Sequence, residues 1–492
     1  MPEQNIKALR VLYLAAEASP LVKIGGLGDV AGELPLALQN LPSALTDNHV
    51  LDVRLVLPFH AAIRKVLPSP RKVAEFTVPY PAGPLVCTAY VTNEDVVTTY
   101  LLSGGLIPEN APVYSPDMAQ DARKYVFFSL AALELCRAIQ WQPDILHAND
   151  WHTAAAVYAL KLRKPRDNFF KDTRSVLTIH NLPFMGAGAE TAMQEAGLPP
   201  SKDSRLPDWG KQFPLVVGML VADKIVAVSP TYAAEILTPE FGVSLDPFLK
   251  TRADAITGIL NGLDYSAWDP ASDGAIPNSY TPETLNTRRK NKLELLNEFN
   301  LEPVLKDPLI IFIGRMDLQK GVDLVIQALQ KCVDLNWQVI LLGTGDPGLE
   351  DMCRLLESDL PDRARTAIRF DARLSRRLYA GADILLMPSR YEPCGLSQMI
   401  AMRYGCIPIA RATGGLRDTI QDESSPNGGT GFLFEPADSA ALAETLHRAI
   451  HVFRKPKIWR QIQLNAMQQN FAWDRSAQAY ANLYLTLQKG SE

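Results

Sequence analysis

Residues 10–38, RVLYLAAEASPLVKIGGLGDVAGELPLAL, decide the fold of this chain. An apolar run is followed by a glycine-rich loop and then by an amphipathic stretch of helical length. This order is typical of a buried parallel strand, a ligand-binding turn and a helix, the opening unit of a doubly wound α/β sheet. The glycines match neither GxGxxG nor GxxxxGK, which disfavours a nicotinamide site or a P-loop nucleotide site.

The same alternation of short apolar runs and helical patterns continues along the chain, as expected for parallel strands covered by helices. The further predicted strands are 53–59, 144–148, 175–180, 224–229, 309–314, 338–343, 384–389 and 407–410.

A polar stretch at 265–285, rich in Pro, Ser, Asp and Thr, separates two such series. A chain of 492 residues also exceeds the usual size of one hydrophobic core. We therefore predict an N-terminal Rossmann-like domain over 1–264 and a second one over 265–465. The last segment, 466–492, is helical in period and is expected to pack back on the first domain.

Composition limits the classes of partner and the cellular locations that we expect for this protein. The net charge of -5 disfavours nucleic acid, which requires a basic surface. The N-terminus lacks a signal-peptide pattern, and we find no apolar run of about 18 residues that could span a membrane. The six cysteines are scattered without metal-ligand spacing. We expect a cytoplasmic protein (or a stromal one in a plastid-bearing organism) without membrane or nucleic-acid partners; the oligomeric state is left open.

The glycine loop offers groups for a phosphorylated sugar. Gly25 and Gly26 let the backbone approach a ligand, Lys23 can neutralise a phosphate, and Asp29 can accept hydrogen bonds from sugar hydroxyls. The alternative is that the glycines only form a tight strand–helix turn.

This loop resembles the KTGGLGDV loop of bacterial glycogen synthases and plastid starch synthases. The resemblance continues, in the family order, through PDILHANDWHTA, LTIHN, VSPTYAAEI, ILNGLD, GRMDLQKG, MPSRYEPCGLSQM and TGGL. It implies the GT-B architecture, with two facing Rossmann-like domains and a cleft between them. It also implies a retaining glucosyltransferase that uses ADP-glucose and the non-reducing end of an α-1,4-glucan, with neither metal nor pyridoxal phosphate as cofactor.

In the first domain the resemblance assigns a catalytic role to His180, which would face the donor sugar. Asp150 is expected to bind sugar or to cap a helix, and Asn261 is expected to contact substrate. The alternatives are a packed histidine at a strand end and a simple Asn-Gly turn. A metal on His147 and His152 is disfavoured by their spacing.

In the second domain Arg315 and Lys320 would stabilise charge on the departing nucleoside diphosphate. Glu392 is expected to hydrogen-bond the transferred glucose. Closure of the domains would add Lys23 to these cations, and the leaving phosphate would assist a same-face displacement. The other predicted contacts are Phe370 (stacked on the base), Cys394, Gly395, Leu396, Thr413, Gly414 and Gly415.

Several positions depart from the family pattern. Ile24 replaces the loop threonine, Phe184-Met185 replaces Tyr-Gln, and Phe213-Pro214 opens a helix whose start is usually polar. These departures leave three alternatives open: an enzyme with a UDP-glucose donor or a small acceptor, a glucan phosphorylase, and a catalytically weak glucan-binding paralogue.

Overall fold

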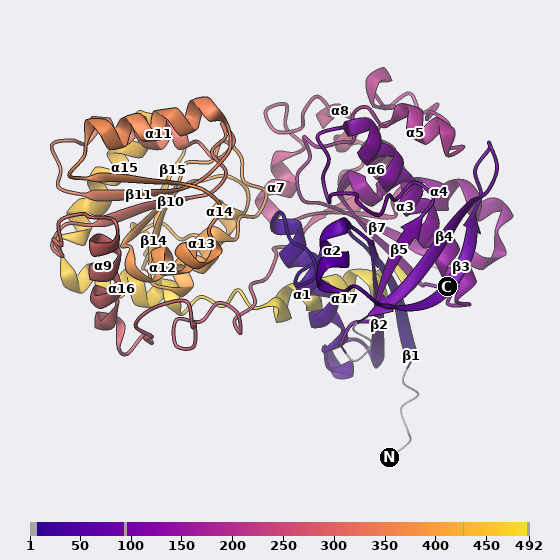
Figure 1. Ribbon diagram of the computed structural model, residues 1–492, viewed down its shortest axis with the longest axis horizontal. Helices are drawn as coiled ribbons and strands as arrows, with labels where there is room; N and C mark the ends of the chain where they lie inside the picture. Colours follow the sequence, from indigo (N-terminus) through magenta and orange to yellow (C-terminus); the bar gives the residue numbers. More distant parts are fainter. Residues whose placement is uncertain (1–6, 93–95, 427, 490–492) are drawn as a thin grey trace, which may run out of the picture. The chain divides into compact units, whose positions relative to one another are not determined.

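The computed structural model describes residues 7–92, 96–426 and 428–489, which form two compact units (Figure 1). The first unit extends to Gly262 and resumes at Trp473; the second is Leu263–Ala472. The sequence indicated changes of unit after residues 264 and 465. Residues 466–472 instead stay with the second unit, where Phe471 O accepts a hydrogen bond from Leu263 N (2.7 Å).

The first unit is built on a sheet in the order β3-β4-β5-β2-β1-β6-β7-β8-β9. Strands β1, β2 and β5 to β9 pair in parallel, and the edge strands β3 and β4 are antiparallel. The bounds are β1 Lys7–Leu14, β2 His49–Pro58, β3 Arg71–Val78, β4 Leu85–Thr92, β5 Thr99–Gly104, β6 Ile145–Asn149, β7 Arg174–Ile179, β8 Lys224–Ala227 and β9 Ile256–Gly258.

The parallel strands predicted for this unit are present with shifted bounds: β2 begins at His49 rather than at residue 53, and β8 ends at Ala227 rather than at residue 229. The first apolar run, 10–18, predicts a strand up to residue 18, but β1 ends at Leu14 and residues 15–25 form the loop before α1. The helices are α1 Gly26–Gln39, α2 Ala61–Val66, α3 Met118–Ala138, α4 Asp150–Arg163, α5 Glu190–Glu195, α6 Pro214–Val221, α7 Pro230–Glu235 and α8 Asp246–Lys250.

The second unit contains a fully parallel sheet in the order β12-β11-β10-β13-β14-β15. Its strands are β10 Leu309–Ile313, β11 Gln338–Gly343, β12 Ala364–Ile368, β13 Ile384–Met387, β14 Ile407–Arg411 and β15 Phe432–Phe434. Its helices are α9 Arg288–Glu298, α10 Val322–Lys331, α11 Pro347–Asp359, α12 Ala372–Gly381, α13 Ser397–Arg403, α14 Gly414–Thr419, α15 Ser439–Phe453 and α16 Pro456–Met467. The central strands are buried because helices cover both faces, which explains their continuous apolar sequences.

The last helix, α17 (Trp473–Lys489), belongs to the first unit and packs against α1 (Figure 1). The Trp473 indole donates a hydrogen bond to Glu33 on α1, and the Ser476 hydroxyl donates to the carbonyl of Leu260 (2.5 Å). The prediction that a C-terminal helix returns to the first domain is confirmed. Within the described residues, no helix is both long and apolar enough to cross a bilayer.

Candidate active site

Most predicted site residues of the first unit follow the ends of three strands. These strands, β1, β6 and β7, are neighbours in the sheet. The loop after β1 contains Lys23, and Asp150 and His180 directly follow β6 and β7. Carboxyl ends of adjacent parallel strands meet at one edge of a sheet, so the fold brings these segments together.

The glycine loop is wound around the buried carboxylate of Glu17. This carboxylate accepts hydrogen bonds from the backbone N–H groups of Ile24 and Gly25 (3.1 Å for Gly25) and from the Tyr114 hydroxyl (2.9 Å). A Cβ at Gly28 would lie 3.0 Å from a Glu17 carboxylate oxygen, so glycine lets the loop close on the acid. Burial raises the pKa of Glu17, and these hydrogen bonds oppose the rise.

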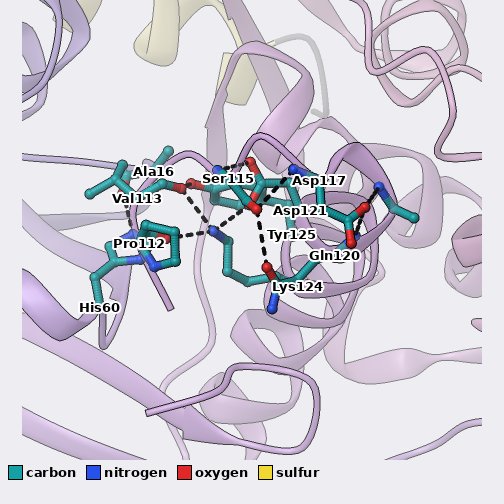
Figure 2. A network of polar contacts seen from close by, with 11 residues as sticks. Ala16, His60, Pro112, Val113, Ser115, Asp117, Gln120, Asp121, Lys124 and Tyr125 are labelled. Carbon is teal, nitrogen blue, oxygen red and sulfur yellow. Dashed lines mark hydrogen bonds and ion pairs between the residues drawn. The ribbon is translucent and has the colours of Figure 1, made fainter. Parts of the chain in front are cut away.

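A buried polar network fixes the segment that carries Tyr114 (Figure 2). Lys124 Nζ donates to the carbonyl oxygens of Pro112 and Val113, both at 2.8 Å, and pairs with Asp121 at 2.7 Å. Burial lowers the pKa of Lys124, and the Asp121 carboxylate opposes this shift. The segment 112–114 is thus tied to α3, which holds the Tyr114 hydroxyl against Glu17.

Lys23 and Asp29, both predicted to contact substrate, form an ion pair at 2.7 Å. Burial raises the pKa of Asp29, and the nearby Lys23 ammonium lowers it in part. Gly25 is the N-cap residue of α1 and Gly26 is its first residue. The Lys23 side chain is exposed, so its ammonium can contact a ligand anion as well as Asp29.

Asp150 begins α4 with φ of 55°, a left-handed conformation that is uncommon for a residue other than glycine. Its buried carboxylate accepts hydrogen bonds from the backbone N–H groups of His180 (2.7 Å) and Asn181 (3.4 Å). Burial raises the pKa of Asp150 to about 7. Asp150 therefore joins the start of α4 to the loop after β7, and its side chain does not cap its own helix.

The two other histidines considered for a metal are packed into the core. His147 is fully buried, with Nδ1 2.6 Å from the Tyr484 hydroxyl of α17 and Nε2 2.7 Å from Thr178 Oγ1. His152 lies among the aromatic rings of Tyr114, Tyr125 and Trp151. Within 7–92, 96–426 and 428–489, no three or more histidine, cysteine or acidic side chains group in a way that could hold a metal ion.

Asn261 is buried after β9, and its side-chain oxygen has no hydrogen-bond partner among the described residues. The next residue, Gly262, lies against the Trp473 ring, where a Cβ would approach to 2.5 Å. The glycine thus serves close packing with α17.

In the second unit all predicted residues except Phe370 lie on the segments that directly follow β10, β13 and β14, again neighbouring strands. Arg315 pairs with Asp317 (2.6 Å), and its side chain is 58% exposed. Lys320 Nζ lies 2.6 Å from Glu392 Oε2, and the Ser389 hydroxyl donates to the same oxygen at 3.0 Å. The structure thus brings Lys320 and Glu392 into direct contact.

Glycines allow these loops to pack closely. A Cβ on Gly414, whose φ is +44°, would lie 2.0 Å from Glu392 O, and a Cβ on Gly415 would lie 2.0 Å from Cys394 O. The Gly415 N–H donates to Glu392 O at 3.1 Å. The loop after β14 therefore supports the loop that carries Glu392.

The remaining predicted residues of this unit differ in position. Cys394 and Thr413 are buried, whereas Gly395 (φ +70°) and Leu396 are partly exposed just before α13. Phe370 follows the edge strand β12, two strands from β10, and is 84% exposed. An exposed ring is free to stack on a base, and this role stays a prediction.

Both halves of the chain match known protein families. Residues 10–251 match the family described as "starch synthase catalytic domain", and residues 296–463 match the family described as "glycosyl transferases group 1". Glycogen synthase of Clostridium perfringens is 36% identical to this chain, over 99% of this chain and 100% of the relative. Glycogen synthase of Thermotoga maritima is 38% identical, over 97% and 98%. The chain belongs to the glycogen synthase family.

A solved structure agrees with this membership. The catalytic domain of starch synthase IV from Arabidopsis thaliana, bound to ADP and acarbose, matches with a TM-score of 0.86 and 28% identity, over 99% of this chain and 100% of that one. The GT-B fold and the retaining glucosyltransferase class predicted from the sequence are confirmed.

The departures from the glycogen synthase pattern differ in burial: Met185 and Pro214 are buried in the first unit, whereas Ile24 and Phe184 are exposed. Ile24 in the glycine loop is 64% exposed, and Phe184 in the loop after β7 is 55% exposed. The Phe213 ring lies 5.5 Å from the Trp209 ring. The exposed Ile24 and Phe184 side chains add apolar surface to the first unit, and the Asp150 carboxylate accepts its hydrogen bonds from the backbone N–H groups of His180 and Asn181.

Sequence reasoning missed Glu17, Tyr114 and Asn149 in this glycogen synthase fold. Glu17 lies in the quoted stretch, and an acid at a strand end before a glycine loop is a signal that could have identified it. Tyr114 reaches it across 97 residues, and Asn149 contacts His180 across 31. No local pattern marks such contacts.

Proposed function

We propose that this glycogen synthase family member transfers glucose from ADP-glucose to the non-reducing end of an α-1,4-glucan, with retention of configuration. The observation that carries the proposal is the contact of Lys320 Nζ with Glu392 Oε2 at 2.6 Å. It sets a cation suited to a leaving diphosphate beside a carboxylate suited to sugar hydroxyls. Family membership supports the glucan and the sugar nucleotide as substrates.

Charge stabilisation by the second unit is the main chemical contribution in this proposal. Negative charge grows on the diphosphate as the glycosidic bond breaks, and fixed cations lower the free energy of that state. Lys320 is held by Glu392, and its ammonium has further protons for phosphate oxygens. Arg315 offers an exposed guanidinium suited to bidentate phosphate contact.

The first unit supplies groups suited to the sugar. Burial lowers the pKa of His180 to about 3, so its ring is neutral near pH 7. A neutral imidazole adds no positive charge beside an oxocarbenium-like centre. The negative charge of the Asp150 carboxylate stabilises the positive charge that develops at this centre. We assign no covalent nucleophile, and the leaving phosphate accepts the proton of the attacking hydroxyl.

The direct test is transfer of labelled glucose to glycogen from ADP-glucose and, in parallel, from UDP-glucose, each with and without EDTA. Strong EDTA-resistant incorporation from ADP-glucose is expected. Preference for UDP-glucose would overturn the donor and keep the reaction class. Binding of glycogen without incorporation from either donor would favour a non-catalytic glucan-binding protein.

Arg315→Ala and Lys320→Ala should each lower turnover by more than about 100-fold, because each removes a cation from the leaving group. The matched control is Arg354→Ala on α11, whose side chain is 52% exposed and also ion-paired. Radiolabel incorporation at saturating donor measures the effect. Near-normal turnover of both variants would remove the leaving-group mechanism.

A further inference from the structure

The orientation of the Asn149 side chain is fixed by its neighbours. Asn149 is fully buried at the end of β6, and its Nδ2 lies 2.9 Å from the carbonyl oxygen of Leu14. A carbonyl oxygen only accepts hydrogen bonds, so the amide nitrogen must face Leu14. The amide oxygen, Oδ1, therefore faces the opposite side.

The Asn149 Oδ1 atom lies 2.9 Å from His180 Nε2 and 3.3 Å from the Tyr13 hydroxyl oxygen. An amide oxygen cannot donate, so both partners must donate to it. His180 consequently carries a hydrogen on Nε2. The other tautomer would oppose two lone pairs at 2.9 Å.

A second layer holds Tyr13 in place. Its ring contacts the His147 ring with centroids 4.5 Å apart, and His147 is bonded on both sides by Tyr484 and Thr178. All four residues are in the first unit, and Tyr13 is fully buried. The Tyr13 hydroxyl therefore has little freedom to leave Asn149.

We propose that Asn149 and Tyr13 are positioning residues that hold His180 as the Nε2–H tautomer, so that its Nδ1 accepts a hydrogen bond from a hydroxyl of the transferred glucose. This inference rests on the proposed function. Neutral imidazole has one donor and one acceptor nitrogen, and the bond to Asn149 decides which is which. The orientation of the ring is set by the same bond.

Two variants of similar size separate positioning from packing. Asn149→Leu removes the acceptor, and turnover should fall about 10- to 100-fold because the His180 ring is no longer oriented. Asn149→Asp keeps an acceptor oxygen and should retain turnover within about tenfold of wild type. It should also raise the pKa of the His180 ring, measured by 15N chemical shift, because an adjacent carboxylate favours protonated His180.

Both variants lack the Nδ2 donor to Leu14, and Asn149→Asp also places a second oxygen against that carbonyl, so the loss at this contact is at least as large for aspartate as for leucine. If Asn149 only packs the core, the order is reversed: leucine is tolerated, and the buried charge of aspartate is not. Leucine more active than aspartate would therefore overturn the proposal. Circular dichroism and the melting temperature establish whether each variant folds.

A direct measurement needs no substrate and is made on the wild-type chain, with one variant used only to assign the signal. Histidine-selective 15N labelling of the full chain reports the protonation state of each ring nitrogen, and His180→Gln assigns the signal. A protonated Nε2 and an unprotonated Nδ1 near pH 7 are expected; the reverse pattern or a charged ring overturns the proposal. If the wild-type protein shows no turnover, the proposed function and the sugar as ligand are wrong. The 15N spectrum still reports the tautomer of His180, because that measurement does not depend on activity.

Discussion

At the scale of single residues, Asp150 combines two costly features. A left-handed backbone costs about 1–3 kcal/mol for a residue other than glycine, and a buried carboxylate loses hydration. The N–H groups of His180 and Asn181 offset part of this cost. A residue without strain or charge could pack equally well at this strand end. The strained backbone and buried carboxylate of Asp150 therefore indicate a functional role.

The pKa of Asp150 predicts a pH dependence. Burial raises the pKa of this carboxyl to about 7, so the carboxylate is lost as pH falls through 7. If the ionised form stabilises the transition state, kcat/KM should decrease below about pH 7. Asp150→Asn should lower kcat/KM by about 10- to 100-fold and abolish this limb. The control Asp203→Asn, in an exposed turn, should leave the limb unchanged; a limb near pH 7 that persists in Asp150→Asn contradicts the assignment.

At the scale of elements, the second unit arranges its site through contacts between loops. The side chain of Arg390, after β13, pairs with Asp323 on α10 (2.7 Å), and Arg390 N donates to Gln319 O (2.8 Å). The loops after β10 and β13 are thus joined next to Lys320 and Glu392. Gly414 and Gly415, which begin α14 after β14, allow close contact with the backbone carbonyl groups of Glu392 and Cys394.

Gly415→Ala should disturb this arrangement. The new Cβ would lie 2.0 Å from Cys394 O, so the loop that carries Glu392 must move. We expect a loss of about 1–3 kcal/mol in stability and at least about a tenfold loss of kcat/KM for the donor. Gly274→Ala is the control, because a Cβ there meets nothing within 4 Å. Donor kinetics and thermal melting measure both effects, and unchanged kinetics would argue against the loop contact as a determinant of the site.

At the scale of the whole molecule, the four histidines whose pKa values are lowered by burial all lie in the first unit. Burial lowers the pKa of four histidines: His60 to about 4, His147 and His180 to about 3, and His152 well below its usual range. The unfolded chain binds these protons below about pH 6.5 and the folded chain does not, so their contribution to stability is lost as pH falls. The raised pKa values of Glu17, Asp29 and Asp150 act in the opposite sense.

His147→Gln isolates one of these contributions. Between about pH 6 and 4 the free energy of unfolding should decrease less steeply in this variant than in wild type. The difference in slope should be up to about 1.4 kcal/mol per pH unit, because the unfolded variant takes up one proton fewer. Hydrogen exchange of peptides from the first unit measures this slope. The exposed His451→Gln on α15 should leave it unchanged, and an equal slope in His147→Gln and wild type would contradict the assignment.

The strand–loop–helix units were predictable from the sequence, and so were the strand ends that Lys23, Asp150, His180, Lys320 and Glu392 follow. Apolar runs specify buried parallel strands locally, and the carboxyl ends of such strands meet at one edge. Residues at those strand ends are therefore predictable without knowledge of the packing. The family motifs then indicated the reaction class.

The tertiary structure shows which distant side chains meet, and the sequence does not. Tyr114 reaches Glu17, Tyr13 and His180 share the Asn149 oxygen, and Tyr484 holds His147 across 337 residues. It also decided that the chain rejoins the first unit at Trp473. Such contacts depend on how helices and strands that are distant in the sequence pack together. The local periodicity of a sequence does not predict that packing.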